Sequence, residues 1–179
     1  MKRLALAGLT LAAGFSLAAA QGNPSGVRGD MIAQLNAAES EITQLATAIG
    51  QDKFSWRPGQ GVRSVSEVFM HVVGANYYLP TFAGVQPTKQ LPANAETAVT
   101  DKAQIQAALK ESFEHVRNAI RKLTDADLDK PATMFGQATT VRNVYLTTVS
   151  HAHEHLGQLI AYARTNGVVP PWSRAGGMD

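Results

Sequence analysis

Apolar residues recur along most of this 179-residue chain at the three- and four-residue spacing of an α-helix, and no convincing strand alternation appears. This periodicity predicts four long amphipathic helices. They are expected at about 27–49, 64–79, 101–123 and 140–165. A Ser-Val-Ser-Glu capping box at 64–67 marks the start of the second helix, and Asn166-Gly167 ends the fourth. Four long helices with two long connections and no repeats predict an all-α fold, a four-helix bundle.

The first twenty residues have the three parts of a secretory signal peptide. Lys2 and Arg3 give a charged start, an apolar stretch runs from Leu4 to Leu17, and Ala18-Ala19-Ala20 is a small-x-small cleavage site. The apolar stretch is short for a bilayer span, so a retained anchor is the weaker interpretation. We therefore expect a signal peptide at 1–20, one mature domain at 21–179 without a membrane span, and a periplasmic or secreted location.

Charge balance and the absence of cysteine narrow the functional classes. The chain has 16 basic and 14 acidic residues, and removing Lys2 and Arg3 with the signal peptide leaves 16 minus 2, or 14, basic residues. A mature chain with balanced charge and no basic run has no electrostatic footprint for nucleic acid. Because the chain has no cysteine, no disulfide stabilises it and no thiolate can act as metal ligand or nucleophile.

Three of the five histidines lie within five positions of the last predicted helix, as His151, His153 and His155. Residues four apart on a helix sit one above the other, so His151 and His155 can aim their rings at one point, whereas His153 points to nearly the opposite side. The pair lies on the inward edge of its helix. His71 lies on the flank of the buried stripe of the second predicted helix, so a third imidazole can reach the same interior.

Three histidines with a position left for water form the pattern of a catalytic rather than a structural zinc-type site. Imidazole ligands suit zinc, nickel, cobalt, copper or iron and argue against calcium or magnesium. Other interpretations stay open. Histidines four apart are common by chance, and a lone His71 is more often a hydrogen-bonded core residue. We expect His115 to be a solvated surface residue, His153 to be a surface residue or one that contacts a metal ligand, and Glu154 to be a solvated charge.

The segment from His151 to Pro171 resembles the final helix and exit of the DinB family, whose members share two histidines four residues apart, then Gly-Gln, an apolar run with arginine, and Gly-x-x-Pro-Pro. Residues 57–71 contain Arg-Pro-Gly, Ser-Val-Ser-Glu and His71, which resemble the same family's entry into its second helix. The resemblance covers essentially the whole mature chain. It implies a DinB-like four-helix bundle that binds a divalent metal, expected to be zinc or nickel, through His71, His151 and His155. An export signal is a departure from the family's pattern, because its members are mostly cytoplasmic.

The resemblance leaves the reaction open. Relatives of this fold include thiol S-transferases, in which the metal lowers the pKa of a thiol cofactor. In a hydrolase, a metal-bound water would instead be the nucleophile, because coordination brings its pKa toward ~7. Export separates the protein from the cytoplasmic thiol pool, and this separation argues against a thiol transferase. Glu67 and Glu154 are the nearest carboxylates in sequence, and we interpret both as structural, so the catalytic residues stay unassigned.

Two further expectations concern assembly and the non-enzyme alternative. A non-catalytic module of the cell envelope that binds a metal or a small ligand is the alternative to an enzyme. The small-molecule substrate or ligand is unknown. By analogy with other bundles of this size, we expect a homodimer.

We predict that residues 1–20 are removed on export, because the charged start, apolar middle and small-x-small end are all present. N-terminal sequencing of protein from the cell envelope should begin at Gln21. A cytoplasmic protein that retains Met1 would contradict the prediction.

Overall fold

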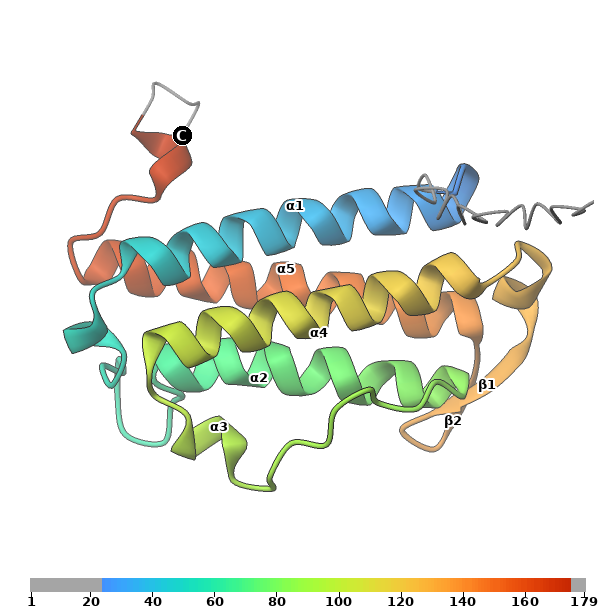
Figure 1. The fold of residues 1–179 in the computed structure, drawn as a ribbon, viewed down its shortest axis with the longest axis horizontal. Coiled ribbons are helices and arrows are strands. Elements are labelled where there is room, and N and C mark those ends of the chain that lie inside the picture. The colour runs from blue at the N-terminus through green and yellow to red at the C-terminus, as the bar shows by residue number, and fades with distance from the viewer. Residues whose placement is uncertain (1–23, 175–179) are drawn as a thin grey trace, which may run out of the picture.

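Four long helices form the body of the protein in a computed structural model that describes residues 24–174 (Figure 1). They are α1 (Gly26–Ala48), α2 (Val65–Tyr78), α4 (Lys102–Lys122) and α5 (Val141–Thr165). The predicted helices lie within two residues of these bounds, and the all-α four-helix bundle is confirmed. The predicted signal peptide lies outside the described residues.

The other elements are short. They are the helix α3 (Ala95–Ala98), the strands β1 (Pro131–Met134) and β2 (Gln137–Thr140), and the 3-10 turns η1 (Gln51–Lys53), η2 (Leu79–Ala83), η3 (Ala126–Asp129) and η4 (Pro171–Ser173). No helix of the described part of the chain is long and apolar enough to cross a membrane.

The two helices α2 and α4 run in the same direction. Helix α1 packs against α4 and α5, and α2 packs against the same two helices, so the consecutive helices α1 and α2 lie diagonally across the bundle. Figure 1 shows that α2 and α4 both start at the end of the bundle where α1 finishes. A parallel pair cannot be joined by a short turn, so the chain returns along the bundle through residues 79–101, here called the crossover. The crossover carries η2 and α3.

One apolar core runs through the bundle and receives side chains from all four long helices. The apolar stripe of α4, spaced three or four residues apart, is fully buried. Its members are Ile105, Leu109, Phe113, Val116 and Ile120. Trp56, in the loop before α2, is partly buried against this core and meets the ring of Tyr162 edge-on at 5.3 Å. Burial of this apolar surface is the main stabilising contribution, since the chain has no disulfide.

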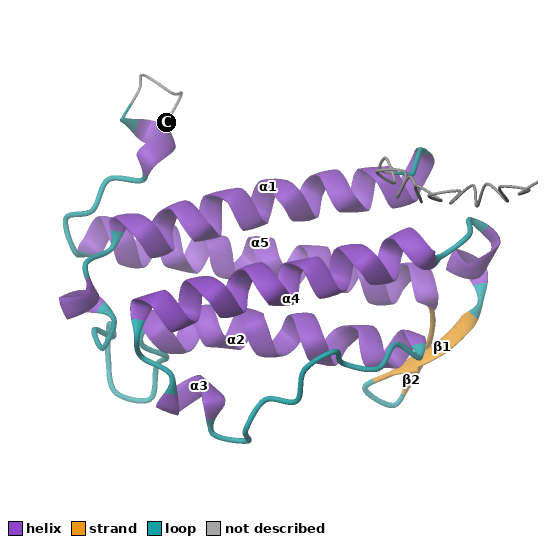
Figure 2. Ribbon diagram, in the orientation of Figure 1, coloured by secondary structure: helices purple, strands orange, loops and turns teal. Residues whose placement is uncertain are grey.

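A β-hairpin between α4 and α5 was not predicted. Strands β1 and β2 pair antiparallel, with Met134 opposite Gln137, at the end of the bundle where α5 begins (Figure 2). The two residues of the turn, Phe135 and Gly136, have φ angles of 51° and 78°. Positive φ at both central positions is the geometry of a two-residue hairpin turn. The sequence signal was weak because Phe-Gly is not a favoured turn pair and each strand has only four residues.

The prediction that His115 is a solvated surface residue was wrong. Its side chain is buried, with 5% of the residue exposed. The ring lies 5.1 Å from the ring of Tyr77, and Nδ1 lies 3.3 Å from the hydroxyl of Thr88 in the crossover. Helix periodicity sets His115 off the apolar stripe of α4, but it carries no information on the crossover segment that covers this flank.

Replacing Ser64 with alanine should destabilise the protein by about 1 kcal/mol, because the Ser64 hydroxyl accepts the Glu67 N–H and the Glu67 carboxylate accepts the Ser64 N–H. Denaturant unfolding measures the loss. The control is Ser40→Ala, at an exposed position in the middle of α1, which should change the free energy of unfolding by less than about 0.5 kcal/mol. Equal effects of the two substitutions would contradict the role of the capping box.

Candidate metal centre

Three histidine rings from two neighbouring helices meet at one point. The Nε2 atom of His151 lies 3.1 Å from Nε2 of His71 and 3.1 Å from Nε2 of His155. One ring nitrogen of each residue lies within 4.8 Å of the other two. His155 is buried, and His71 and His151 are half-buried. The structure therefore brings together the three residues that the sequence singled out, here called the histidine cluster.

The third histidine of α5 lies elsewhere. Nε2 of His153 is 3.2 Å from the carbonyl oxygen of Gln34 on α1, so this ring faces a different neighbour. The separation follows from helix geometry, since a two-residue step turns the side chain by about 200°. As expected from the spacing, His153 is not part of the cluster.

The outer nitrogens of two cluster rings are held by hydrogen bonds. Nδ1 of His71 donates to Oε2 of Glu96 at 3.0 Å, and Nδ1 of His155 donates to Oε1 of Gln158 at 2.8 Å. A proton on Nδ1 leaves the lone pair of Nε2 directed at the centre of the cluster. This tautomer is the one required for metal binding through Nε2, and such outer hydrogen bonds also fix the orientation of the ring.

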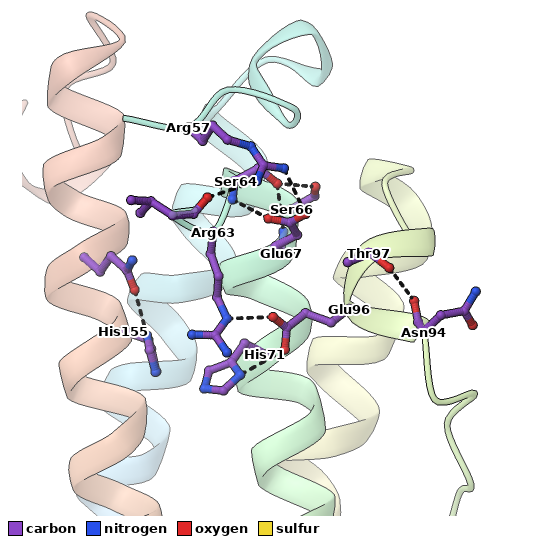
Figure 3. A network of polar contacts seen from close by, with 12 residues as sticks. Arg57, Arg63, Ser64, Ser66, Glu67, His71, Asn94, Glu96, Thr97 and His155 are labelled. Carbon is purple, nitrogen blue, oxygen red and sulfur yellow. Dashed lines mark hydrogen bonds and ion pairs between the residues drawn. The ribbon is translucent and has the colours of Figure 1, made fainter. Parts of the chain in front are cut away.

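Arg63, just before α2, joins the two outer hydrogen bonds into one network. Its Nε donates to Oε1 of Glu96 at 2.6 Å, and its carbonyl accepts the hydroxyl of Tyr162 at 3.2 Å. Tyr162 in turn accepts a hydrogen bond from Nε2 of Gln158 at 2.9 Å. Figure 3 shows Glu96 reaching from α3 between Arg63 and His71. The network ties α2, α3 and α5 together around the cluster.

Sequence reasoning missed Glu96, and it interpreted the two carboxylates that it considered, Glu67 and Glu154, as structural. Glu67 completes the predicted capping box and pairs with Arg57 at 2.9 Å, and the backbone hydrogen bond at Ser64 is the largest cause of its lowered pKa. Glu154 is exposed and makes no hydrogen bond to the cluster among the described residues. Glu96 lies in the predicted irregular connection, where nothing local pointed to it. Gln158 could have been found, since it follows His155 by three residues on the same helix.

The electrostatics around His71 and His151 favour neutral rings beside an ionised carboxylate. Burial is the largest cause that lowers the pKa of His151 to about 4, and the neighbouring rings of His155 and His71 contribute in the same direction. Burial also lowers the pKa of His71, against the opposing effect of Glu96. For Glu96 itself burial raises the pKa, but hydrogen bonds from Arg63 and His71 outweigh it and keep the pKa below its usual value. At neutral pH His71 and His151 are therefore neutral, and each ring has a lone pair available to a metal.

This donor set fits a divalent transition metal. Tetrahedral coordination with metal–nitrogen bonds of ~2.0 to 2.1 Å places ligand nitrogens about 3.3 Å apart. The observed separations of 3.1 Å are close to that value. Nitrogens that converge at this distance need a proton or a cation between them to avoid repulsion of their lone pairs, and neutral imidazole is a preferred ligand of zinc and nickel.

Comparison with known proteins adds independent findings. The model of the DinB superfamily matches residues 34–159. A DinB-like protein from Bacillus cereus ATCC 10987 has a similar structure, with a TM-score of 0.70 and 18% identity over 81% of this chain and 95% of that one. A DinB-like protein of Bacillus subtilis, YjoA, gives a TM-score of 0.61 and 20% identity over 77% and 92% of the two chains.

A third structure carries a functional description. YfiT from Bacillus subtilis, described as a probable metal-dependent hydrolase with an unusual four-helix bundle topology, gives a TM-score of 0.65 and 16% identity over 83% of this chain and 92% of that chain. Comparison with curated proteins gives no match. At these identities the structural similarity establishes the fold.

Replacing Glu96 with glutamine should weaken metal affinity by ~10- to 100-fold, because an amide accepts a weaker hydrogen bond from Nδ1 of His71 and loses its ion pair with Arg63. Competition with a chromogenic chelator measures the change. Glu154→Gln is the matched control, since it removes the same charge from an exposed position beside His155 and should leave affinity nearly unchanged. If both variants bind metal as the parent does, Glu96 has no role in holding the ring.

Proposed function

This chain belongs to the DinB superfamily, and from that premise we propose that it is an exported, metal-dependent hydrolase of a small molecule. The observation that carries the proposal is the convergence of the Nε2 atoms of His71, His151 and His155, two of them with their Nδ1 atoms engaged elsewhere. When bound there, zinc or nickel supplies Lewis-acid chemistry, which lowers the pKa of a coordinated water or thiol.

An open groove gives a small molecule access to the cluster. It has a volume of about 330 Å³ and follows one face of α5, where His151, Ser150, Leu146 and Glu154 line it. Glu154 is exposed, so its carboxylate is free to accept a proton from a molecule in the groove. Leu146 is 47% exposed and offers apolar contact to the same molecule. The groove thus combines binding surface, a proton acceptor and one cluster ring.

Three arguments favour a hydrolase over the other candidates. Among the described residues the cluster contains three potential ligands and no fourth, which is the pattern of a site that keeps a position for substrate or water. A structural neighbour is described as a probable metal-dependent hydrolase. Export, proposed from residues 1–20 alone, would place the protein outside the cytoplasmic thiol pool on which a thiol transferase depends.

Replacing His155 with alanine should abolish stoichiometric metal binding, because the remaining two rings cannot hold the ion alone. Metal analysis of the purified mature protein measures the loss, and His153→Ala should keep a full equivalent. A chelator should lower the melting temperature of the parent and of the His153 variant, but not that of the His155 variant, since a ligand stabilises only the state that binds it. Metal retained by the His155 variant would overturn the ligand assignment.

The reaction itself is tested on metal-loaded mature protein with a panel of aryl esters, amides and lactams, and in parallel with low-molecular-weight thiols and an aryl halide. The proposal is supported if the parent hydrolyses a substrate and His155→Ala does not, even after zinc or nickel is added to the variant. Thiol transfer without hydrolysis would replace it with the transferase. Stoichiometric metal without either reaction would favour the binding module of the cell envelope.

A further inference from the structure

A second cavity lies between α4, the end of α2 and the crossover, and no member of the histidine cluster lines it. Its volume is about 640 Å³, within the size range of small-molecule sites. In Figure 1 the crossover passes below α2 and α4, the two helices that supply the inner wall. We call it the α4 cavity. Nothing in the proposed hydrolase activity uses it.

A buried histidine with an unused nitrogen lines the α4 cavity. His115 is 95% buried, and its Nδ1 is engaged by the hydroxyl of Thr88 at 3.3 Å. Its Nε2 is buried and has no hydrogen-bond partner among the described residues. An unpaired buried polar atom costs stability, so a native structure with such an atom beside a cavity indicates a missing partner. Burial, and to a lesser extent Lys122, lowers the pKa of His115, so the ring is neutral at pH 7 and carries one N–H.

The charges around the α4 cavity leave one cation without a partner. Lys89 and Glu111 pair with each other at 2.7 Å, and Glu114 is held by two arginines of its own helix. Lys122 also lines the cavity and forms no ion pair with any described residue. Because the acidic side chains are already neutralised, an anion is the complementary occupant.

Four of the other lining residues are apolar or aromatic, and Gln86 and Asn118 add uncharged polar groups. Tyr77 is 5% exposed and Ala119 is 6% exposed, and Val85 and Leu123 are half-buried. Such a surface excludes water from a flat apolar body and would not suit a small inorganic anion. An apolar wall with a few convergent polar groups is typical of sites for small organic molecules.

We propose that the α4 cavity binds a small organic carboxylate with an aromatic or aliphatic body. The carboxylate pairs with the ammonium group of Lys122 and accepts a hydrogen bond from Nε2–H of His115, while the hydroxyl of Thr88 donates to Nδ1. The body of the ligand packs against Tyr77 and Val85. The site is separate from the metal centre, so it is able to bind in metal-free and metal-loaded protein alike.

The probes are benzoate and 3-phenylpropanoate, with benzyl alcohol and benzylamine as neutral and cationic counterparts. In protein labelled on histidine, the carboxylates should shift the His115 ring resonance, identified by its loss in His115→Gln, in a saturable way. Lys122→Gln should weaken carboxylate binding by about tenfold, the loss expected for one charged hydrogen bond. Lys110→Gln removes the same charge from an exposed position of α4 that does not line the cavity and should leave binding unchanged.

Lys122 is exposed, so its substitution should leave the fold intact, which the melting temperature checks. Carboxylates that fail to saturate at millimolar concentration would overturn the proposal. So would equal binding of benzoate and benzylamine, or equal losses in the two lysine variants. Metal content enters none of these readouts, so failure here leaves the hydrolase proposal standing, and loss of the metal site leaves this one standing.

Discussion

The parallel direction of α2 and α4 is the constraint on which the rest of the structure depends. A bundle helix of this length spans about 30 Å, so the chain has to travel back along the bundle before α4 can begin. The crossover makes that return: its η2 and α3 pack against α2, and its Thr88 reaches His115 on α4. Its α3 turn brings Glu96 to His71, and its earlier part brings Thr88 to His115. One topological requirement thus shapes both the histidine cluster and the α4 cavity.

Within the cluster, geometry and electrostatics act in the same direction. The i, i+4 spacing on α5 sets His151 and His155 one turn apart, and packing of α5 against α2 supplies His71. Burial keeps His71 and His151 neutral, while Glu96 and Gln158 hold the outer nitrogens of His71 and His155. Arg63 restrains both supports at once, through its guanidinium group and its carbonyl. Metal sites depend on such outer restraints, because a ring that is free to rotate loses orientation when the ion leaves.

The α4 cavity and the histidine cluster suit ligands of opposite charge. Here a single imidazole is buried with one nitrogen satisfied by the crossover and the other unpaired, beside a cation that has no partner among the described residues. The cluster combines lone pairs and suits a cation, whereas this cavity combines an N–H and an ammonium group and suits an anion. The same residue type therefore serves opposite chemistry in the two sites, depending on whether the neighbour at Nδ1 accepts or donates the hydrogen bond.

The sequence by itself determined the four helices, their buried faces and the three histidines, because these depend on periodicity within one helix and on spacings of three or four residues. The capping box at Ser64 is equally local. Tertiary structure alone decided the partners that lie far apart in the chain, such as Glu96 for His71 and Arg63 for Tyr162. It also decided the burial of His115, since helix periodicity tells which residues share a face but not which connection covers that face.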